Sequence, residues 1–208
     1  MFVDLIQVLR CPLPHADGRL VAIATRTVDR HLIDGTLGCA ECGAEYEVRD
    51  GAAWFHSRGA TAAPAELAID ANDAGEVLRL AALLGVDDRG GRFLLDGGWS
   101  AMVPALRDVG TLEALVLEAR APGASSLRDC GDELPIAAGS LRGVVLARTS
   151  AGLAASATRA LMPNGRLVAP AGTAVPVGVS VLARDERQWV ATRDAGASTS
   201  GTVRLRRA

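Results

Sequence analysis

Lysine is absent from this chain of 208 residues, so every basic side chain apart from three histidines is an arginine. Without lysine the chain cannot form a Schiff base, and it cannot supply the phosphate-binding lysine of a P-loop. The formal net charge is only −2. A chain so close to neutral has no overall attraction for nucleic acid or anionic lipid, so we expect no direct nucleic-acid contact.

Cysteine and long apolar runs are also scarce. The four cysteines are Cys11, Cys39, Cys42 and Cys130. They are too few and too clustered for a disulfide framework in a chain of this length, which favours a reducing, cytoplasmic environment. No apolar run approaches the roughly 18 residues of a membrane helix, and the N-terminus lacks the pattern of a signal peptide. The sequence therefore predicts a cytoplasmic protein that does not enter a membrane.

The most informative stretch that is present begins with Cys39-Ala-Glu-Cys42-Gly43. Two cysteines two residues apart, followed by glycine, form a tight knuckle whose thiolates converge as a tetrahedral zinc site requires. The alternating residues 45–48 then predict a short strand, and Asp50-Gly51 predicts a turn. Upstream, the apolar segment 5–9 leads to Cys11-Pro12, where the second knuckle of a zinc ribbon is expected.

The first knuckle has only one cysteine. Its sequence is Cys11-Pro12-Leu13-Pro14-His15, and His15 is the nearest replacement for the missing thiolate. An imidazole nitrogen is as good a zinc donor as sulfur, so a Cys-x-x-x-His spacing can close a tetrahedral site. Two interpretations stay open. Either zinc is held by Cys11, His15, Cys39 and Cys42, or the metal was lost and His15 is a solvated loop residue.

Further patterns define the domain organisation. Strands are predicted at 20–24, 31–38 and 52–55. Together with the knuckles they give a small β-rich domain at residues 1–57. Residues 58–65 are small and lack periodicity, which predicts a linker. A second domain is then expected at 66–208.

The second domain alternates strands with helices. A helix is predicted at 66–85, with Gly85 as its C-cap, and others at 99–109 and 150–162. Apolar runs without polar alternation, which are typical of strands buried in a parallel sheet, occur at 93–96, 112–118, 141–147 and 165–170. The end predicts an antiparallel hairpin at 179–184 and 188–192, then a basic tail at 203–207. This order predicts a doubly wound α/β sheet with helices on both faces.

The first quarter of the chain resembles the Trm112-like family of zinc-ribbon domains. The resemblance is carried by the apolar lead, Cys11-Pro12, the Cys39 to Gly43 knuckle, the aromatic Tyr46 and the closing Asp50-Gly51. Members of that family are activating partners of methyltransferases that modify tRNA, rRNA and translation factors. The resemblance therefore implies a protein partner, either a methyltransferase or a translation-related protein.

The second domain is similar to class I S-adenosylmethionine-dependent methyltransferases. Asp96-Gly97-Gly98 stands where that family has an acid and a glycine-rich turn beneath the cofactor. Glu118 stands where a carboxylate binds the ribose hydroxyls, and Asp132 begins a segment whose acid faces the adenine. The segment Leu161 to Leu167 is similar to the turn before the family's fifth strand. The resemblance implies that the chain binds S-adenosylmethionine as a cofactor. The binding residues would be Asp96, Gly97, Gly98, Glu118 and Asp132.

The chain also departs from that family. The second glycine of the turn is replaced by Ser100, and Trp99 beside it can fill the cofactor pocket. Only thirteen residues, 119–131, separate Glu118 from Asp132, which leaves little room for a crossover helix and an intervening strand. No Asp/Asn-Pro-Pro-aromatic motif follows the strand at 141–147, and no catalytic base is visible. We therefore expect a reduced sheet and a trimmed cofactor site.

Two functional hypotheses remain. The first is a non-catalytic adaptor or regulatory protein, a pseudoenzyme in which Asp96 and Glu118 only cap loops at strand ends. The second is an active methyltransferase with a Trm112-like activator fused in cis. The departures favour the first. Cys130 is expected to be inert, because no histidine lies near it in the sequence.

Overall fold

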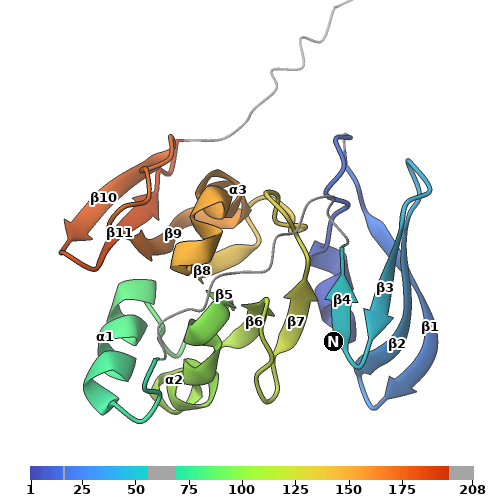
Figure 1. Ribbon diagram of the computed structural model, residues 1–208, viewed down its shortest axis with the longest axis horizontal. Helices are drawn as coiled ribbons and strands as arrows, with labels where there is room; N and C mark the ends of the chain where they lie inside the picture. Colours follow the sequence, from blue (N-terminus) through green and yellow to red (C-terminus); the bar gives the residue numbers. More distant parts are fainter. Residues whose placement is uncertain (16, 56–68, 197–208) are drawn as a thin grey trace, which may run out of the picture.

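We describe a computed structural model of the chain, in which residues 1–15, 17–55 and 69–196 are described. The predicted linker at 58–65 and the predicted basic tail at 203–207 lie outside the described residues. The described residues form one mixed sheet, with helices packed on its faces (Figure 1).

The N-terminal part is an antiparallel meander. It consists of a 3-10 helix η1 (Val3–Val8) and strands β1 (Leu20–Val28), β2 (His31–Cys39), β3 (Glu45–Arg49) and β4 (Ala52–Trp54). In β3 the predicted alternation is confirmed, because Tyr46 and Val48 are buried while their neighbours are exposed. The turn to β4 has φ of 47° at Asp50 and 75° at Gly51, the conformation that Asp-Gly favours in a tight hairpin.

The C-terminal part alternates helices with strands. Its elements are α1 (Ala74–Leu84), β5 (Arg92–Asp96), η2 (Gly97–Met102), α2 (Val103–Val109), β6 (Glu113–Leu117), β7 (Ser125–Arg128), β8 (Leu141–Val145), η3 (Arg148–Leu153), α3 (Ala154–Ala160), β9 (Leu161–Pro170), β10 (Val179–Arg184) and β11 (Gln188–Arg193). The strands from β5 to β9 are parallel, and β11 is antiparallel between β9 and β10. The predicted closing hairpin is therefore confirmed.

The complete strand order is β1-β2-β3-β4-β7-β6-β5-β8-β9-β11-β10. The chain leaves β5 in one direction through β6 and β7, and then returns to add β8 and β9 on the other side. This order is doubly wound, and it places a topological switch point between β5 and β8. The predicted α/β fold class, with a β-rich N-terminal part, is confirmed.

The two parts share one sheet. Strand β4 of the meander pairs in parallel with β7, with Ala52 opposite Ser126 and Trp54 opposite Arg128. The resulting sheet is continuous from β1 to β10, and Figure 1 shows how its strands are arranged. The proposed boundary between residues 57 and 66 stays a prediction, and the sheet hydrogen bonds cross from one side of it to the other.

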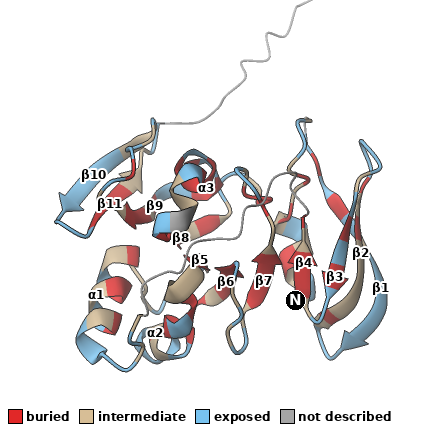
Figure 2. Ribbon diagram, in the orientation of Figure 1, coloured by how far each residue is buried: buried red, intermediate tan, exposed pale blue. Residues whose placement is uncertain are grey.

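Each face of the sheet has its own core. On one face, Leu94 packs with Ala157 of α3 and with the meander. On the opposite face, Leu95 packs with Leu80 of α1 and Leu106 of α2. Figure 2 shows that burial is concentrated in the central strands, whereas the outermost strands β1 and β10 are mainly exposed. Helices on both faces agree with the prediction.

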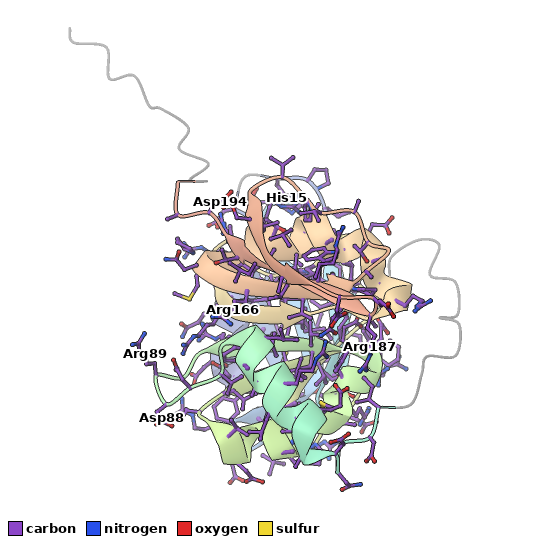
Figure 3. All side chains as sticks on the ribbon, turned by 90° about the vertical axis from the view of Figure 1, so that its left-hand side faces the viewer. His15, Asp88, Arg89, Arg166, Arg187 and Asp194 are labelled. Atoms are coloured by element: carbon purple, nitrogen blue, oxygen red, sulfur yellow. The ribbon has the colours of Figure 1, made fainter. Side chains whose placement is uncertain are left out.

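Arginines of β9 and of the β10–β11 turn hold α1 in place. Arg166 donates to the carbonyls of Ala82 and Leu83 in the last turn, where a helix has unsatisfied acceptors and a negative dipole end. Arg187 pairs with Glu76 near the first turn. Figure 3 views the molecule from this side and shows Arg166 and Arg187 on either side of α1.

Some predicted boundaries were wrong. Within the described residues, the helix predicted at 66–85 begins only at Ala74, because the Asp73 carboxylate accepts the N–H groups of Gly75 and Glu76 as an N-cap. Its C-cap is Gly85, as predicted. Strand β9 begins at Leu161, four residues before the predicted strand at 165. The expected turn is a bulge within it, where Asn164 has a φ of 63°.

The connection between Glu118 and Asp132 was only partly predicted. As expected, no crossover helix is present between β6 and β7. The strand that seemed to lack room is nevertheless formed as β7, which pairs in parallel with β6 after a connection of seven residues, 118–124. Strand β4 then pairs with the outer edge of β7, so the meander covers an edge that would otherwise be exposed.

Candidate metal centre and the carboxyl edge of the sheet

Cys11, His15, Cys39 and Cys42 come together where the two knuckles face each other. One donor atom from each residue lies within 4.8 Å of the other three. Cys11 Sγ is 3.9 Å from Cys42 Sγ, and Cys39 Sγ is 3.3 Å from His15 Nε2. The two cysteines on the core side are buried, and Cys42 is exposed.

These separations fit a tetrahedral metal ion. Zinc bonds of about 2.3 Å to sulfur and about 2.0 Å to nitrogen place two ligand sulfurs about 3.8 Å apart, and a sulfur and a nitrogen about 3.5 Å apart. The observed distances of 3.9 and 3.3 Å are close to both values. The group can therefore hold a zinc ion without a large rearrangement, and three thiolates with one imidazole are donors that zinc prefers.

The surroundings of the group position its ligands. The buried Tyr46 hydroxyl lies 2.9 Å from Cys11 Sγ. The Glu41 carboxylate accepts the N–H of Gly18 at 2.8 Å, which joins the two knuckles. Gly18 has a φ of 58°, and a Cβ there would lie 3.2 Å from the His15 ring. Glycine therefore suits this position on both backbone and steric grounds.

The two buried thiols differ in acidity. Burial raises the pKa of Cys39, but the backbone N–H groups of Cys42 and Glu41, together with neighbouring thiols, outweigh it and lower the pKa to about 7. Burial raises the pKa of Cys11, and the Tyr46 hydrogen bond offsets only part of that increase. Because metal ligands must be deprotonated, the lowered pKa of Cys39 suits a metal ligand.

At the carboxyl edge of the sheet, the acid of the predicted cofactor turn makes a hydrogen bond within the protein. Asp96 ends β5 and is 1% exposed. Its carboxylate accepts the N–H of Ala147 at 2.9 Å, which connects the ends of β5 and β8 across the switch point. Gly97 has a φ of 53°, and Gly97 and Gly98 are the first two residues of the short helix η2. The crevice where doubly wound folds bind ligands is thus bridged by a side chain.

Glu118 lies at the end of β6, as predicted, in a strained turn. The φ of Glu118 is 53°, and the φ of its hydrogen-bond partner Asp129 is 54°. This left-handed conformation costs about 1–3 kcal/mol in a residue other than glycine. The Glu118 carboxylate accepts the N–H of Asp129 at 2.6 Å. Glu118 is exposed as a residue, yet burial of its carboxyl group raises its pKa, and the Asp129 hydrogen bond offsets this only in part.

A small hollow adjoins Glu118. Its lining comprises Leu117, Glu118, Cys130, Gly131, Asp132, Ser150, Gly152 and Leu153. The fold therefore brings Glu118 and Asp132 together, but it does not bring Asp96, Gly97 or Gly98 to the same hollow. The volume is about 100 Å³, below the roughly 300–1,000 Å³ of ordinary small-molecule sites.

Two other predicted residues near this edge have different surroundings. Trp99 packs against the core on the α1 and α2 face and does not line the small hollow. Cys130 is 3% exposed, and burial raises the pKa of its thiol well above the ordinary value. Because the thiolate is the reactive form, this raised pKa agrees with the expectation that Cys130 is inert, which stays a prediction.

A larger hollow lies beside the metal group. It has a volume of about 720 Å³ and separates the first knuckle, Arg10 to Gly18, from the loop Glu133 to Ala138 and from Arg159 on α3. Ion pairs between Arg10 and Asp17 and between Arg159 and Glu133 lie on its two sides. Sequence reasoning did not find this hollow, because its walls are more than 100 residues apart in the chain.

Sequence reasoning also missed Tyr46 and Glu41 as supports of the metal group. Glu41 lies between Cys39 and Cys42, and Tyr46 follows them by four residues. Their positions in the sequence could have indicated this role, because residues inside a knuckle, or in the strand that follows it, lie close to the ligands. Their actual contacts with Cys11 and Gly18 require the first knuckle to fold over, which spacing alone does not show.

No protein-family model matches the chain, and no curated protein matches it. Among solved structures, it is similar to the complex between the Haloferax volcanii Trm112 methyltransferase activator and the putative methyltransferase. That match has 19% identity and a TM-score of 0.35, and covers 48% of this chain and 57% of that one. The pyocyanin biosynthetic protein PhzM matches at 16% identity and a TM-score of 0.39, covering 56% of this chain and 54% of that one.

The T. thermophilus 16S rRNA N2 G1207 methyltransferase RsmC, in complex with AdoMet and guanosine, matches at 18% identity and a TM-score of 0.32. It covers 93% of this chain and 46% of that one. The chain spans about half the length of the first solved structures that it matches. Because these TM-scores are below 0.5, the fold class rests on the strand order of this chain. Within the described part of the chain, no helix is long and apolar enough to span a membrane.

Proposed function

We propose that this protein is a non-catalytic adaptor or regulatory module, built from a Trm112-like ribbon and a methyltransferase-like sheet. The observation that supports this proposal is the bridged switch point. The Asp96 carboxylate accepts the Ala147 N–H, and the hollow beside Glu118 measures about 100 Å³. S-adenosylmethionine requires a site several times larger, so the cofactor residues act in the fold rather than in methyl transfer.

The metal group has a structural role in this proposal. Cys11, His15, Cys39 and Cys42 supply four protein ligands, and a zinc site closed by four protein ligands leaves no position for water or substrate. Bound zinc would fix the two knuckles and supply no catalysis. The protein partner implied by the Trm112-like resemblance, a methyltransferase or a translation-related protein, must bind elsewhere than at β4, whose edge already pairs with β7.

The test is calorimetric titration of the purified full chain with S-adenosylmethionine and with S-adenosylhomocysteine. The proposal predicts no binding at micromolar concentrations of either ligand. Micromolar binding that Glu118→Ala abolishes would overturn it. Glu186→Ala is the matched control, because Glu186 is an exposed acid in the β10–β11 turn, far from β6 along the sheet.

The second candidate function is an active methyltransferase with its activator fused in cis. It is favoured by the shared position of Glu118 and Asp132, which line one hollow at the carboxyl edge, as the resemblance requires. The same titration decides between the two candidates. Binding that depends on both carboxylates supports the enzyme, and absence of binding supports the adaptor.

The metal assignment has its own test. Elemental analysis of the wild type should give about one zinc per chain. His15→Ala should lower that content, whereas His31→Ala should not, because His31 packs edge-on against Phe2 and is not part of the metal group. An unchanged zinc content in His15→Ala removes His15 from the site.

A further inference from the structure

The loop at residues 129–138, which follows β7, borders both hollows of the carboxyl edge. Gly131 and Asp132 line the smaller hollow, and Glu133 to Ala138 form one wall of the larger one. A change in the position of this loop therefore changes the shape of both.

The loop is bound through its backbone to the segment that precedes the first metal ligand. The Ala137 N–H donates to the Val8 carbonyl at 2.7 Å, and the Arg10 N–H donates to the Pro135 carbonyl at 2.9 Å. Between these two hydrogen bonds, Leu9 and Ile136 form an antiparallel bridge. Cys11 is the next residue along the chain, so the bridge and the metal group are joined without any flexible connection.

The other side of the loop is also packed near the metal group. Leu134 and Ile136 are buried in the same core as Cys11 and Tyr46. The Leu134 N–H donates to the Ser156 hydroxyl of α3 at 2.7 Å. The loop thus lies between the first knuckle and α3, and it contacts both.

The first knuckle is held in place by the Tyr46 hydroxyl, which lies 2.9 Å from Cys11 Sγ, and by backbone hydrogen bonds. Cys11 donates its N–H to the Gly18 carbonyl at 2.7 Å, a bond within the knuckle itself. The Gly18 N–H bonds to Glu41 across to the second knuckle. These hydrogen bonds are much weaker than four metal–ligand bonds. A metal ion would therefore be the main connection between residues 11–15 and 39–42.

We infer that metal binding to Cys11, His15, Cys39 and Cys42 sets the conformation of the loop at 133–138, through the bridge between residues 8–10 and 135–137. The inference rests on the metal binding proposed above. With metal bound, the bridge is held and both hollows keep the shape described here. When metal is lost, the first knuckle moves and the loop loses its backbone partners, whereas β10 and β11 at the far edge of the sheet are unaffected.

Hydrogen exchange of the full chain, followed by mass spectrometry before and after zinc chelation, tests the inference. We expect the amides of Leu134, Ile136 and Ala137, which are hydrogen-bonded here, to exchange at least about tenfold faster without metal. Amides of residues 189–191 in β11 should be unchanged, and added zinc should restore the loop. Cys42→Ser, which removes an exposed thiol, should reproduce the effect of chelation.

A second pair of variants separates the bridge from the metal. Arg10→Pro removes the N–H that donates to Pro135, so its loop should exchange fast even when zinc is bound. Arg10→Ala keeps that N–H and serves as the control. Fast exchange in Arg10→Pro with an unchanged zinc content supports the bridge as the route, and slow exchange in it overturns that route.

The remaining outcomes are decisive. Unchanged loop exchange after chelation overturns the inference, because the metal would then have no effect on the loop. Equal loss of protection in the loop and in β11 overturns it as well, because the metal would support the whole fold. A chain that binds no zinc overturns the metal assignment and the inference together. The titration with S-adenosylmethionine is independent of all these results.

Discussion

The metal group and the Asp96 turn are two places where a ligand site was predicted, and their side chains are engaged in different ways. At the metal group, four donor atoms from two knuckles converge within 4.8 Å. At the turn, the Asp96 carboxylate already accepts the backbone N–H of Ala147, two residues after the end of β8, and Glu118 accepts another from Asp129. Donors that converge on one point are prepared for an ion, whereas acceptors bonded to the backbone are part of the scaffold.

The two halves of the sheet differ in a similar way. The buried residues of the meander belong to one core, which they share with one face of the parallel strands, while the parallel strands have a second core on their other face. The pairing of β4 with β7 joins the halves through the backbone. If bound metal mainly stabilises the meander and side-chain packing mainly stabilises the parallel strands, substitutions in the two halves should have different effects.

The largest effect is expected from core truncations in each half. Leu94→Ala in β5 and Leu37→Ala in β2 each remove a side chain that is 0% exposed, and each should lower the free energy of unfolding by about 2–5 kcal/mol. Because the sheet is continuous, both variants should shift one cooperative transition in denaturant. Two separate transitions, each moved by only one variant, would show that the halves unfold independently.

Tyr46→Phe tests the support of the metal group by a neighbouring hydroxyl. Removing the hydroxyl that lies 2.9 Å from Cys11 Sγ should weaken zinc binding about 10- to 100-fold, as is typical when a partner of a metal ligand is lost. Competition with a chromophoric chelator measures the affinity. Tyr→Phe preserves the ring contact with Phe55, so an unchanged affinity would mean that the hydroxyl does not support the site.

Gly18→Ala tests the backbone of the first knuckle. The left-handed φ of 58° and the close His15 ring predict a loss of about 1–2 kcal/mol in unfolding free energy. Gly43→Ala is the matched control, because Gly43 has a φ of 71° and a Cβ added to it would have no atom within 4 Å. Equal losses in the two variants would show that the backbone conformation, not the contact with His15, causes the effect.

The smallest effect concerns Glu118 and pH. Because the pKa of Glu118 is raised in the folded chain, folding is favoured while the carboxyl is protonated. That contribution is complete below the unfolded-state pKa of about 4.3 and is lost as pH rises through the folded-state pKa. Glu118→Gln should remove this part of the pH dependence of unfolding, measured from pH 3 to 8. An unchanged profile would show that the carboxyl is not desolvated.

Local patterns in the sequence predicted much of this fold. Apolar runs gave β5, β6 and β8 close to their observed bounds, and Asp50-Gly51 gave the hairpin between β3 and β4. The cysteine spacing indicated three residues of the group whose donor atoms converge, and His15 was the nearest candidate for the fourth, with loss of the metal as the open alternative. These successes share one reason. Strand periodicity, tight turns and knuckles are each specified within a few consecutive residues.

Other features depend on residues far apart in the chain. The parallel pairing of β4 with β7 joins segments about 70 residues apart, and no pattern in residues 125–128 marked them as a strand. The bond from Ala147 to Asp96 decides whether that carboxylate is free for a ligand, and it spans 51 residues. A sequence motif shows that an acidic residue lies at the end of a strand, but it does not show which group the carboxylate is hydrogen-bonded to.

The alternation of strands and helices, the two knuckles and the residue types that can bind zinc follow from local sequence, because these depend on neighbours along the chain. Long-range packing was needed to join the meander to the parallel sheet, to bridge the crevice at Asp96, and to pair the loop after β7 with the segment before Cys11. Those outcomes depend on backbone hydrogen bonds between distant segments, and such bonds are fixed by packing rather than by local pattern.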